Sequence, residues 1–238
     1  MSNIVISGSN GFIGKHLVSK LSENKKYKLI KMDRSLGNIS KKKTWKKLPK
    51  AKILIHLAAK TFVPSSWNNP KEFFETNVLG TVMALEYCRI NKSKLIFLSS
   101  YLYGNADKFP TNEKAKIKIN NPLALTKMTA EEICKFYSKH YGLKIIILRP
   151  SNIYGPNQKD FWLIPEILNK FKKKTIIVNN FNIKRDLIYV VVSRYSIFLP
   201  YFIGEVIIFI YIYCRTSYPF HSCAFIPCHG TFHCGFII

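Results

Sequence analysis

Residues 3–14 read NIVISGSNGFIG, and this stretch decides the fold. Residues 3–7 are predicted to form a short buried strand, and an amphipathic helix is predicted to follow the turn. The turn has the pattern G-x-x-G-x-x-G, formed by Gly8, Gly11 and Gly14. These glycines allow a tight turn, a close approach of the backbone to a pyrophosphate and close helix packing, while N–H groups at the helix start attract phosphates. The stretch therefore predicts a dinucleotide-binding unit.

The second predicted strand, residues 27–33, ends in an acidic residue, Asp33, about 20 residues after the glycines. A carboxylate at this place accepts hydrogen bonds from the adenosine ribose, which favours NAD. Arg34 follows directly, and an arginine there could instead pair with the 2′-phosphate of NADP. The sequence thus predicts NAD as the cofactor, with NADP the less favoured alternative.

Further predicted strands and helices alternate along the chain. Apolar runs that are typical of buried parallel strands occupy residues 52–59, 94–100 and 143–149. Helices are predicted over residues 70–91 and 122–141. This alternation predicts an α/β fold with a Rossmann-type, doubly wound parallel sheet.

The chain of 238 residues carries a formal charge of +24. Its basic residues are 31 Lys and 6 Arg, spread over nearly every predicted surface segment in a region that is also rich in Asn and Ile. This composition indicates A/T-rich codons rather than a surface built for phosphate, so no specific nucleic-acid binding is expected. No secretory signal opens the chain, because residues 1–14 are the nucleotide motif, and a cytoplasmic location is expected.

The composition changes abruptly near residue 185. All 31 Lys and 18 Asn lie at or before Lys184, and the last 54 residues contain neither. Those residues are rich in Ile, Phe, Tyr, Cys and His instead. We therefore divide the chain into residues 1–190, a NAD-binding domain with the start of a substrate region, and residues 191–238, an aberrant apolar tail of unknown structure.

The tail allows several interpretations. The ending of a truncated, frameshifted gene would explain the absence of Lys and Asn. Residues 197–213 are apolar enough to suggest a membrane span, but Pro200, Gly204 and Glu205 interrupt them and their length is marginal, so a membrane contact is not favoured. Zinc is not expected either, because the spacing of the tail's candidate ligands matches no familiar site; these are Cys223, Cys228, His229, His233 and Cys234.

Five motifs in order make residues 1 to about 190 resemble the extended short-chain dehydrogenase/reductase family, in its NAD-dependent sugar-nucleotide epimerase/dehydratase branch. They are the glycine turn, HLAA at residues 56–59, TNVLGT at 76–81, SSYLYG at 99–104 and LRPSNIYGP at 148–156. The resemblance implies NAD as cofactor, a nucleotide sugar as substrate, and a homodimer formed through the two long helices. It ends at Val190, so an incomplete C-terminal substrate domain is expected.

The resemblance also implies a set of binding residues. Those expected to hold the cofactor are Gly8, Asn10, Gly11, Phe12, Ile13, Gly14, Asp33, Arg34, Asn38, Ile39, Leu57, Ala58, Ala59, Asn77, Lys127 and Pro150. Asn38 stands where the family has an Asp that contacts adenine, and its side-chain oxygen can still accept that bond. Asn77 could alternatively be an ordinary amide on a helix surface. The expected substrate contacts are Ser66, Asn152 and Arg185.

The family's central catalytic group is missing from this chain. In the family, a tyrosine phenolate accepts the sugar's hydroxyl proton while the hydride passes to NAD, helped by a lysine four residues later and by a Ser or Thr. The catalytic residues expected here are Lys127 and Ser99 or Ser100, whereas Leu123 occupies the place of the tyrosine. Leucine cannot accept a proton, so we expect impaired catalysis. The alternative is a noncatalytic NAD-binding or interaction module, which could associate with a membrane through the tail.

Overall fold

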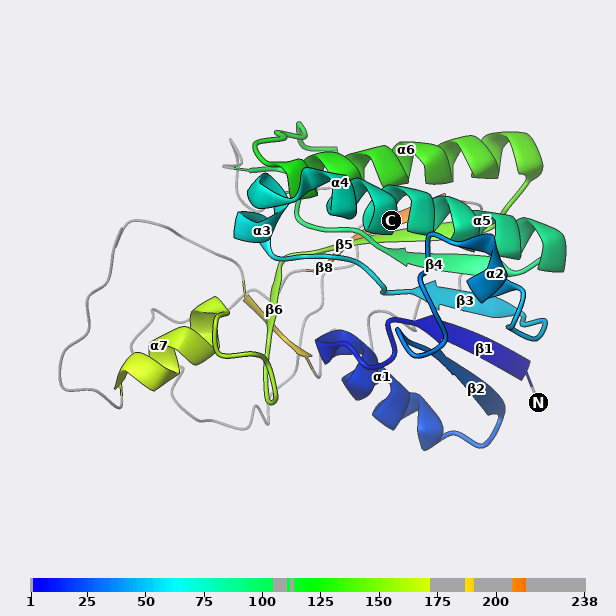
Figure 1. Cartoon of the computed structure of the whole chain (residues 1–238), viewed down its shortest axis with the longest axis horizontal. Coiled ribbons are helices and arrows are strands. Elements are labelled where there is room, and N and C mark those ends of the chain that lie inside the picture. The colour runs from blue at the N-terminus through cyan, green and yellow to red at the C-terminus, as the bar shows by residue number, and fades with distance from the viewer. Residues whose placement is uncertain (1, 105–110, 112–113, 172–186, 191–206, 213–238) are drawn as a thin grey trace.

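A computed structural model describes residues 2–104, 111, 114–171, 187–190 and 207–212, and it confirms the doubly wound parallel sheet (Figure 1). Six parallel strands lie in the order β2-β1-β3-β4-β5-β8. Their bounds are β1 Ser2–Ser7, β2 Tyr27–Met32, β3 Ile53–His56, β4 Lys94–Leu98, β5 Ile145–Pro150 and β8 Ile207–Ile212. The chain order reverses between β1 and β3, and ligands of such sheets bind at this point, beyond the carboxyl ends of the strands.

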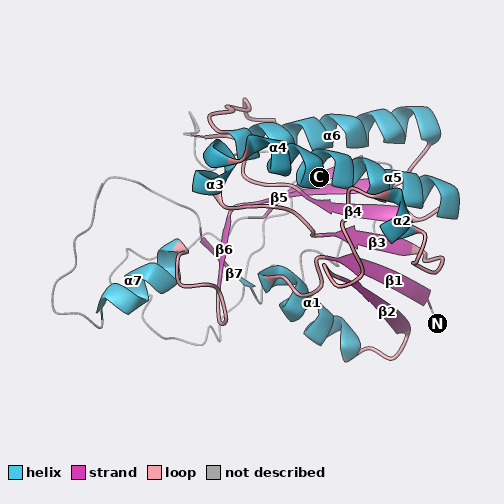
Figure 2. Ribbon diagram, in the orientation of Figure 1, coloured by secondary structure: helices cyan, strands magenta, loops and turns pink. Residues whose placement is uncertain are grey.

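Helices cover both faces of the sheet (Figure 2). One face carries α1 (Phe12–Ser22). The other carries α4 (Pro70–Phe73), η1 (Phe74–Leu79), α5 (Gly80–Asn91) and α6 (Pro122–Tyr141). The remaining described elements are α2 (Lys42–Trp45), α3 (Val63–Asn68), α7 (Leu163–Phe171) and the parallel pair β6 (Asn152–Tyr154) and β7 (Leu187–Tyr189).

The core has two halves because successive strand residues point to opposite faces of the sheet. Val5 and Leu54 belong to the cluster that includes residues of α5 and α6, whereas Ile4 and Ile6 belong to the cluster that includes Leu17 of α1. All five side chains are fully buried. The apolar runs of the sequence are therefore strands buried on both faces, as predicted.

The structure differs from the prediction in one helix and at the ends of the strands expected over residues 52–59 and 94–100, the second of which ends at Leu98. It also describes a strand in the tail, for which no structure was predicted. The helix expected over residues 70–91 contains a π-helical segment, η1, between α4 and α5. The strand expected over residues 52–59 ends at His56, and the residues after it form a loop. In the tail, Ile207–Ile212 pairs with β5 in parallel, in a register that runs from Ile145↔Ile207 to Pro150↔Ile212.

The membrane and zinc interpretations of the tail can be compared with the described residues only. No helix within the described ranges is long and apolar enough to cross a bilayer. The candidate zinc ligands lie outside the described residues, and elsewhere in the described part of the chain no three His, Cys, Asp or Glu residues gather as a metal site would require.

Candidate NAD site and catalytic residues

The glycine turn joins β1 to α1 as predicted. Gly8 has a φ of +75°, a conformation that side chains disfavour, and its N–H donates to the Met32 carbonyl at 2.8 Å. A Cβ on Gly14 would lie 2.2 Å from the Gly8 carbonyl oxygen, so α1 packs directly against the turn. Gly11 is the N-cap of α1 and has no side chain with which to cap the helix. The first N–H groups of α1 are thereby left for an anionic ligand.

Asp33 lies just after β2, beside the glycine turn. Its carboxylate accepts hydrogen bonds from the Ser35 hydroxyl at 2.6 Å, from the Ser35 N–H at 2.8 Å and from the Asn10 amide. The Ser35 hydroxyl, and then the Ser35 N–H, lower the pKa of Asp33. The group is therefore a charged acceptor at the place where the ribose is expected. Arg34 is exposed beside it.

Asn38, the expected adenine contact, forms hydrogen bonds within its own turn. The Asn38 side-chain oxygen accepts the Ser40 N–H at 2.8 Å and the Ser40 hydroxyl at 2.9 Å. Ile39 packs against the core, and its carbonyl accepts the Trp45 indole N–H at 2.7 Å. The Asn38 side chain thus stabilises its own turn, and an adenine amino group would share an oxygen that already accepts two bonds.

The loop after β3 is fixed to two neighbouring elements. The Leu57 N–H donates to the Ser7 carbonyl at 3.1 Å, at the end of β1. Asn77, in η1, accepts the Lys60 N–H at 2.8 Å, and its amide N–H₂ donates at 3.0 Å to the Lys60 carbonyl and to the Thr126 hydroxyl of α6. Asn77 is 1% exposed, so the alternative of a surface amide is wrong. The loop with Ala58 and Ala59 is held between the glycine turn and α6.

Lys127 is buried on α6, at the carboxyl end of β4. Its ammonium donates to the Leu98 carbonyl at 2.7 Å and lies 5.1 Å from the centre of the Phe97 ring. Burial lowers the pKa of Lys127 to about 8. Ser99 follows Leu98 directly, and its buried hydroxyl has no hydrogen-bond partner in the described part of the chain. Ser100 is partly exposed.

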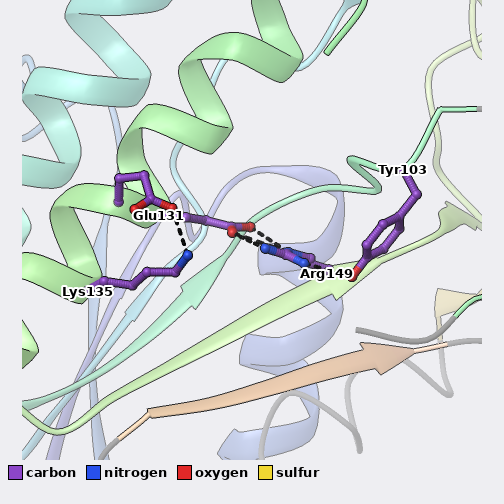
Figure 3. A network of polar contacts seen from close by, with 5 residues as sticks. Tyr103, Glu131, Lys135 and Arg149 are labelled. Atoms are coloured by element: carbon purple, nitrogen blue, oxygen red, sulfur yellow. Dashed lines mark hydrogen bonds and ion pairs between the residues drawn. The ribbon is translucent and has the colours of Figure 1, made fainter. Parts of the chain in front are cut away.

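Leu123 is buried one helical turn before Lys127, and no acidic or basic group stands in its place. Tyr103 is fully buried, and its hydroxyl accepts the Arg149 Nη1–H at 2.7 Å (Figure 3). Arg149 also donates from Nε to Glu131 Oε1 at 2.9 Å and from Nη2 to Glu131 Oε2 at 2.5 Å. This Tyr103–Arg149–Glu131 network joins α6, β5 and the loop after β4, which gives Tyr103 a structural role.

The expected substrate residues that the structure describes, Ser66 and Asn152, belong to different elements, α3 and β6. Ser66 is fully buried, and its hydroxyl donates to the Val63 carbonyl at 2.6 Å. Asn152 is exposed on β6, Pro150 is buried at the end of β5, and Arg185 lies outside the described residues.

Sequence reasoning missed several polar residues at this edge of the sheet. His56 and Arg149 each stand in an otherwise apolar strand, and both are buried with hydrogen bonds to other elements. A polar residue inside an apolar run was the available signal, because a buried polar group needs partners. Thr81 and Thr126 gave no such signal, since each has the spacing of an ordinary helix residue.

Comparison with known proteins identifies the family. The model of the NAD dependent epimerase/dehydratase family matches residues 4–191, and the chain belongs to this family. It is 32% identical over 241 residues to dTDP-D-glucose 4,6-dehydratase of Dictyostelium discoideum, an alignment that covers 84% of this chain and 56% of that protein. It is 31% identical over 176 residues to GDP-6-deoxy-D-mannose reductase of Pseudomonas aeruginosa, covering 68% of this chain and 55% of that protein.

Solved structures agree with this membership. The UDP-glucose 4-epimerase of Thermotoga maritima, solved with UDP-glucose, is similar with a TM-score of 0.83 and 26% identity, over 89% of this chain and 77% of that one. The chain spans little more than half the length of the two curated relatives. By their names, these three relatives are enzymes that modify nucleotide sugars.

Proposed function

We propose that this chain binds NAD(H) at the carboxyl edge of its sheet and is impaired as a nucleotide-sugar epimerase or dehydratase. The glycine turn and Asp33 would hold the pyrophosphate and the ribose, and the ionised Asp33 would repel the 2′-phosphate of NADP. The observation that carries the proposal is the hydrogen bond from the buried Lys127 ammonium to the Leu98 carbonyl. Leu98 directly precedes Ser99, whose hydroxyl has no hydrogen-bond partner among the described residues. Leu123 takes the place where proton transfer needs an oxygen.

The chemistry that NAD would supply is hydride acceptance and return, and the chain would have to supply a base. Loss of a general base lowers a rate by roughly 10²- to 10⁴-fold. Lys127 could hold the cofactor and Ser99 a hydroxyl of the sugar, but neither replaces the phenolate. Leu123 also favours the second proposal, a noncatalytic NAD-binding or interaction module. Measurable turnover of a nucleotide sugar would distinguish an impaired enzyme from such a module.

Calorimetric titration with NAD(H) and NADP(H) tests the cofactor. We expect tighter binding of NAD(H), and Asp33→Asn should narrow the preference because it removes the charge that opposes the 2′-phosphate. Equal or tighter NADP(H) binding by the unaltered chain would indicate that Arg34, and not Asp33, determines the cofactor preference. Failure to bind either dinucleotide would refute the proposal.

NADH formation on UDP- and dTDP-sugars tests the chemistry. We expect very low turnover by the unaltered chain, and none restored by Leu123→Tyr alone, since a family-like ending after Val190 would also be needed. Restoration by Leu123→Tyr alone would show that the tyrosine is the only defect. Substantial turnover without any change would mean that another residue is the base.

Assembly and location complete the proposal. A homodimer is favoured by exposed apolar side chains on η1, α5 and α6, which are Phe74, Leu79, Ile90, Leu125, Phe136 and Tyr141. We also propose a cytoplasmic location for the chain, with NAD(H) as cofactor and nucleotide sugars as the substrate class.

A further inference from the structure

A buried histidine lies between the glycine turn and the helices of the opposite face, and the proposed chemistry does not use it. His56 is the last residue of β3 and is 1% exposed. Its ring is stacked on Phe97, with centroids 6.0 Å apart, and lies 6.2 Å from the Trp45 ring. Nδ1 is 2.6 Å from the Ser7 hydroxyl, and Nε2 is 3.4 Å from the Thr81 hydroxyl.

The neighbouring hydrogen bonds determine the direction of both contacts. The Thr81 hydroxyl gives its single proton to the Asn77 carbonyl at 2.6 Å, so it can only accept from His56 Nε2. The Ser7 oxygen accepts the Ala58 N–H at 3.4 Å, which leaves the Ser7 proton for His56 Nδ1. Both ring nitrogens are therefore satisfied only if Nε2 carries the proton and Nδ1 does not.

The electrostatic surroundings also favour this neutral form. Burial, and to a smaller extent the charge of Lys127, lower the pKa of His56 to about 3. The groups that face the ring are the hydroxyls of Ser7 and Thr81 and the aromatic rings of Phe97 and Trp45. A protonated Nδ1 would leave the Ser7 hydroxyl proton buried without its acceptor, which is costly.

We propose that His56, as the neutral Nε2–H tautomer, is a positioning residue for the dinucleotide site. On one side it fixes Ser7, which immediately precedes Gly8 and holds the Ala58 N–H. On the other side it contacts Thr81 of α5, whose hydroxyl donates to the Asn77 carbonyl in η1. The Asn77 side chain in turn forms hydrogen bonds with the N–H and the carbonyl of Lys60. The glycine turn and the loop after β3 are thereby kept in one arrangement. This inference rests on the proposed binding of NAD(H).

Thr81→Val and its matched control Thr81→Ser test the inference. Valine keeps the shape of the side chain and removes the acceptor of Nε2–H, whereas serine keeps the hydroxyl. We expect Thr81→Val to weaken NAD binding roughly tenfold, as a lost buried hydrogen bond does, while Thr81→Ser restores it. Adenosine, which has the ribose expected at Asp33 but no phosphate for the glycine turn, should bind all three proteins within about twofold. Calorimetry measures both affinities at a temperature where circular dichroism shows each variant folded.

A spectroscopic signature completes the test. ¹⁵N spectra of the full chain at neutral pH should show His56 with a protonated Nε2 and a bare Nδ1, a signal that a merely space-filling histidine need not give. The other tautomer or a cationic ring would overturn the inference, as would equal NAD affinity of Thr81→Val and Thr81→Ser. If Thr81→Val does not fold, Ser7→Ala is measured in its place, with the same expected loss. No NAD binding by the unaltered chain would refute the proposed function, and the inference with it.

Discussion

Replacing Glu131 by Gln should destabilise the fold strongly, because Glu131 is the counter-charge of a buried arginine. The exposed fractions of the Arg149 and Glu131 side chains are 4% and 0%, and their shortest contact is 2.5 Å. Removing one partner of a buried pair costs about 3–5 kcal/mol, since the other charge is left uncompensated. Glutamine keeps the shape and one acceptor, so we expect about 3 kcal/mol. For a chain of this size, that loss lowers the Tm by about 6–12 °C.

The adjacent residue provides the matched control. Glu132 pairs with Lys135 at 2.7 Å, but the side chains of Lys135 and Glu132 are 37% and 52% exposed. Exposed pairs contribute about 0–1 kcal/mol, so Glu132→Gln should scarcely change stability. Urea unfolding followed by circular dichroism measures both free energies. If Glu131→Gln costs no more than Glu132→Gln, the network of Figure 3 is not what joins α6 to β5.

Three further predictions concern the pKa of Lys127, two glycines and the homodimer. Because the pKa of Lys127 falls to about 8 on folding, the unfolded chain binds more protons at this residue above that pH. The unaltered chain should therefore gain stability relative to Lys127→Met between about pH 8 and 10.5, as measured by urea unfolding. A stability difference that stays constant over this range would contradict the lowered pKa. Gly14→Ala places a Cβ 2.2 Å from the Gly8 oxygen and should abolish measurable NAD binding, whereas Gly142→Ala, which meets nothing within 4 Å, should leave binding unchanged and cost about 1 kcal/mol. Light scattering at micromolar concentration should show a dimer, and a clean monomer would contradict the homodimer.

The sequence predicts the sheet well because its signals are local. The glycine turn and the apolar runs of β1, β3 and β5 specify strands buried on both faces without reference to the rest of the chain. The π-helical segment was not predictable in this way, since it coincides with Asn77, whose side chain bonds to Lys60 and Thr126. Those partners lie 17 and 49 residues away, beyond any periodicity. The pairing of Ile207–Ile212 with β5 has no local signal either.

The candidate site shows the same division. A motif predicts that Lys127 is a site residue, but only the structure shows that its ammonium donates a hydrogen bond to the Leu98 carbonyl. Asn38 and Ser66 were expected from the resemblance to bind ligands, and their oxygens already participate in local hydrogen bonds. A motif specifies the residue type at a position, whereas its partners depend on the packing of neighbouring elements.

The loss of the tyrosine affects the two roles expected of Lys127 unequally. An ammonium has three N–H donors, and the Leu98 carbonyl takes one of them. The other donors can serve a cofactor hydroxyl whatever stands at position 123, so binding does not depend on the missing phenol. Lowering the pKa of a phenol, by contrast, requires that the phenol be present, and Leu123 offers only carbon. We therefore expect NAD binding and proton transfer to depend on different residues of one helical turn, so that a chain with Leu123 would lose the second while keeping the first.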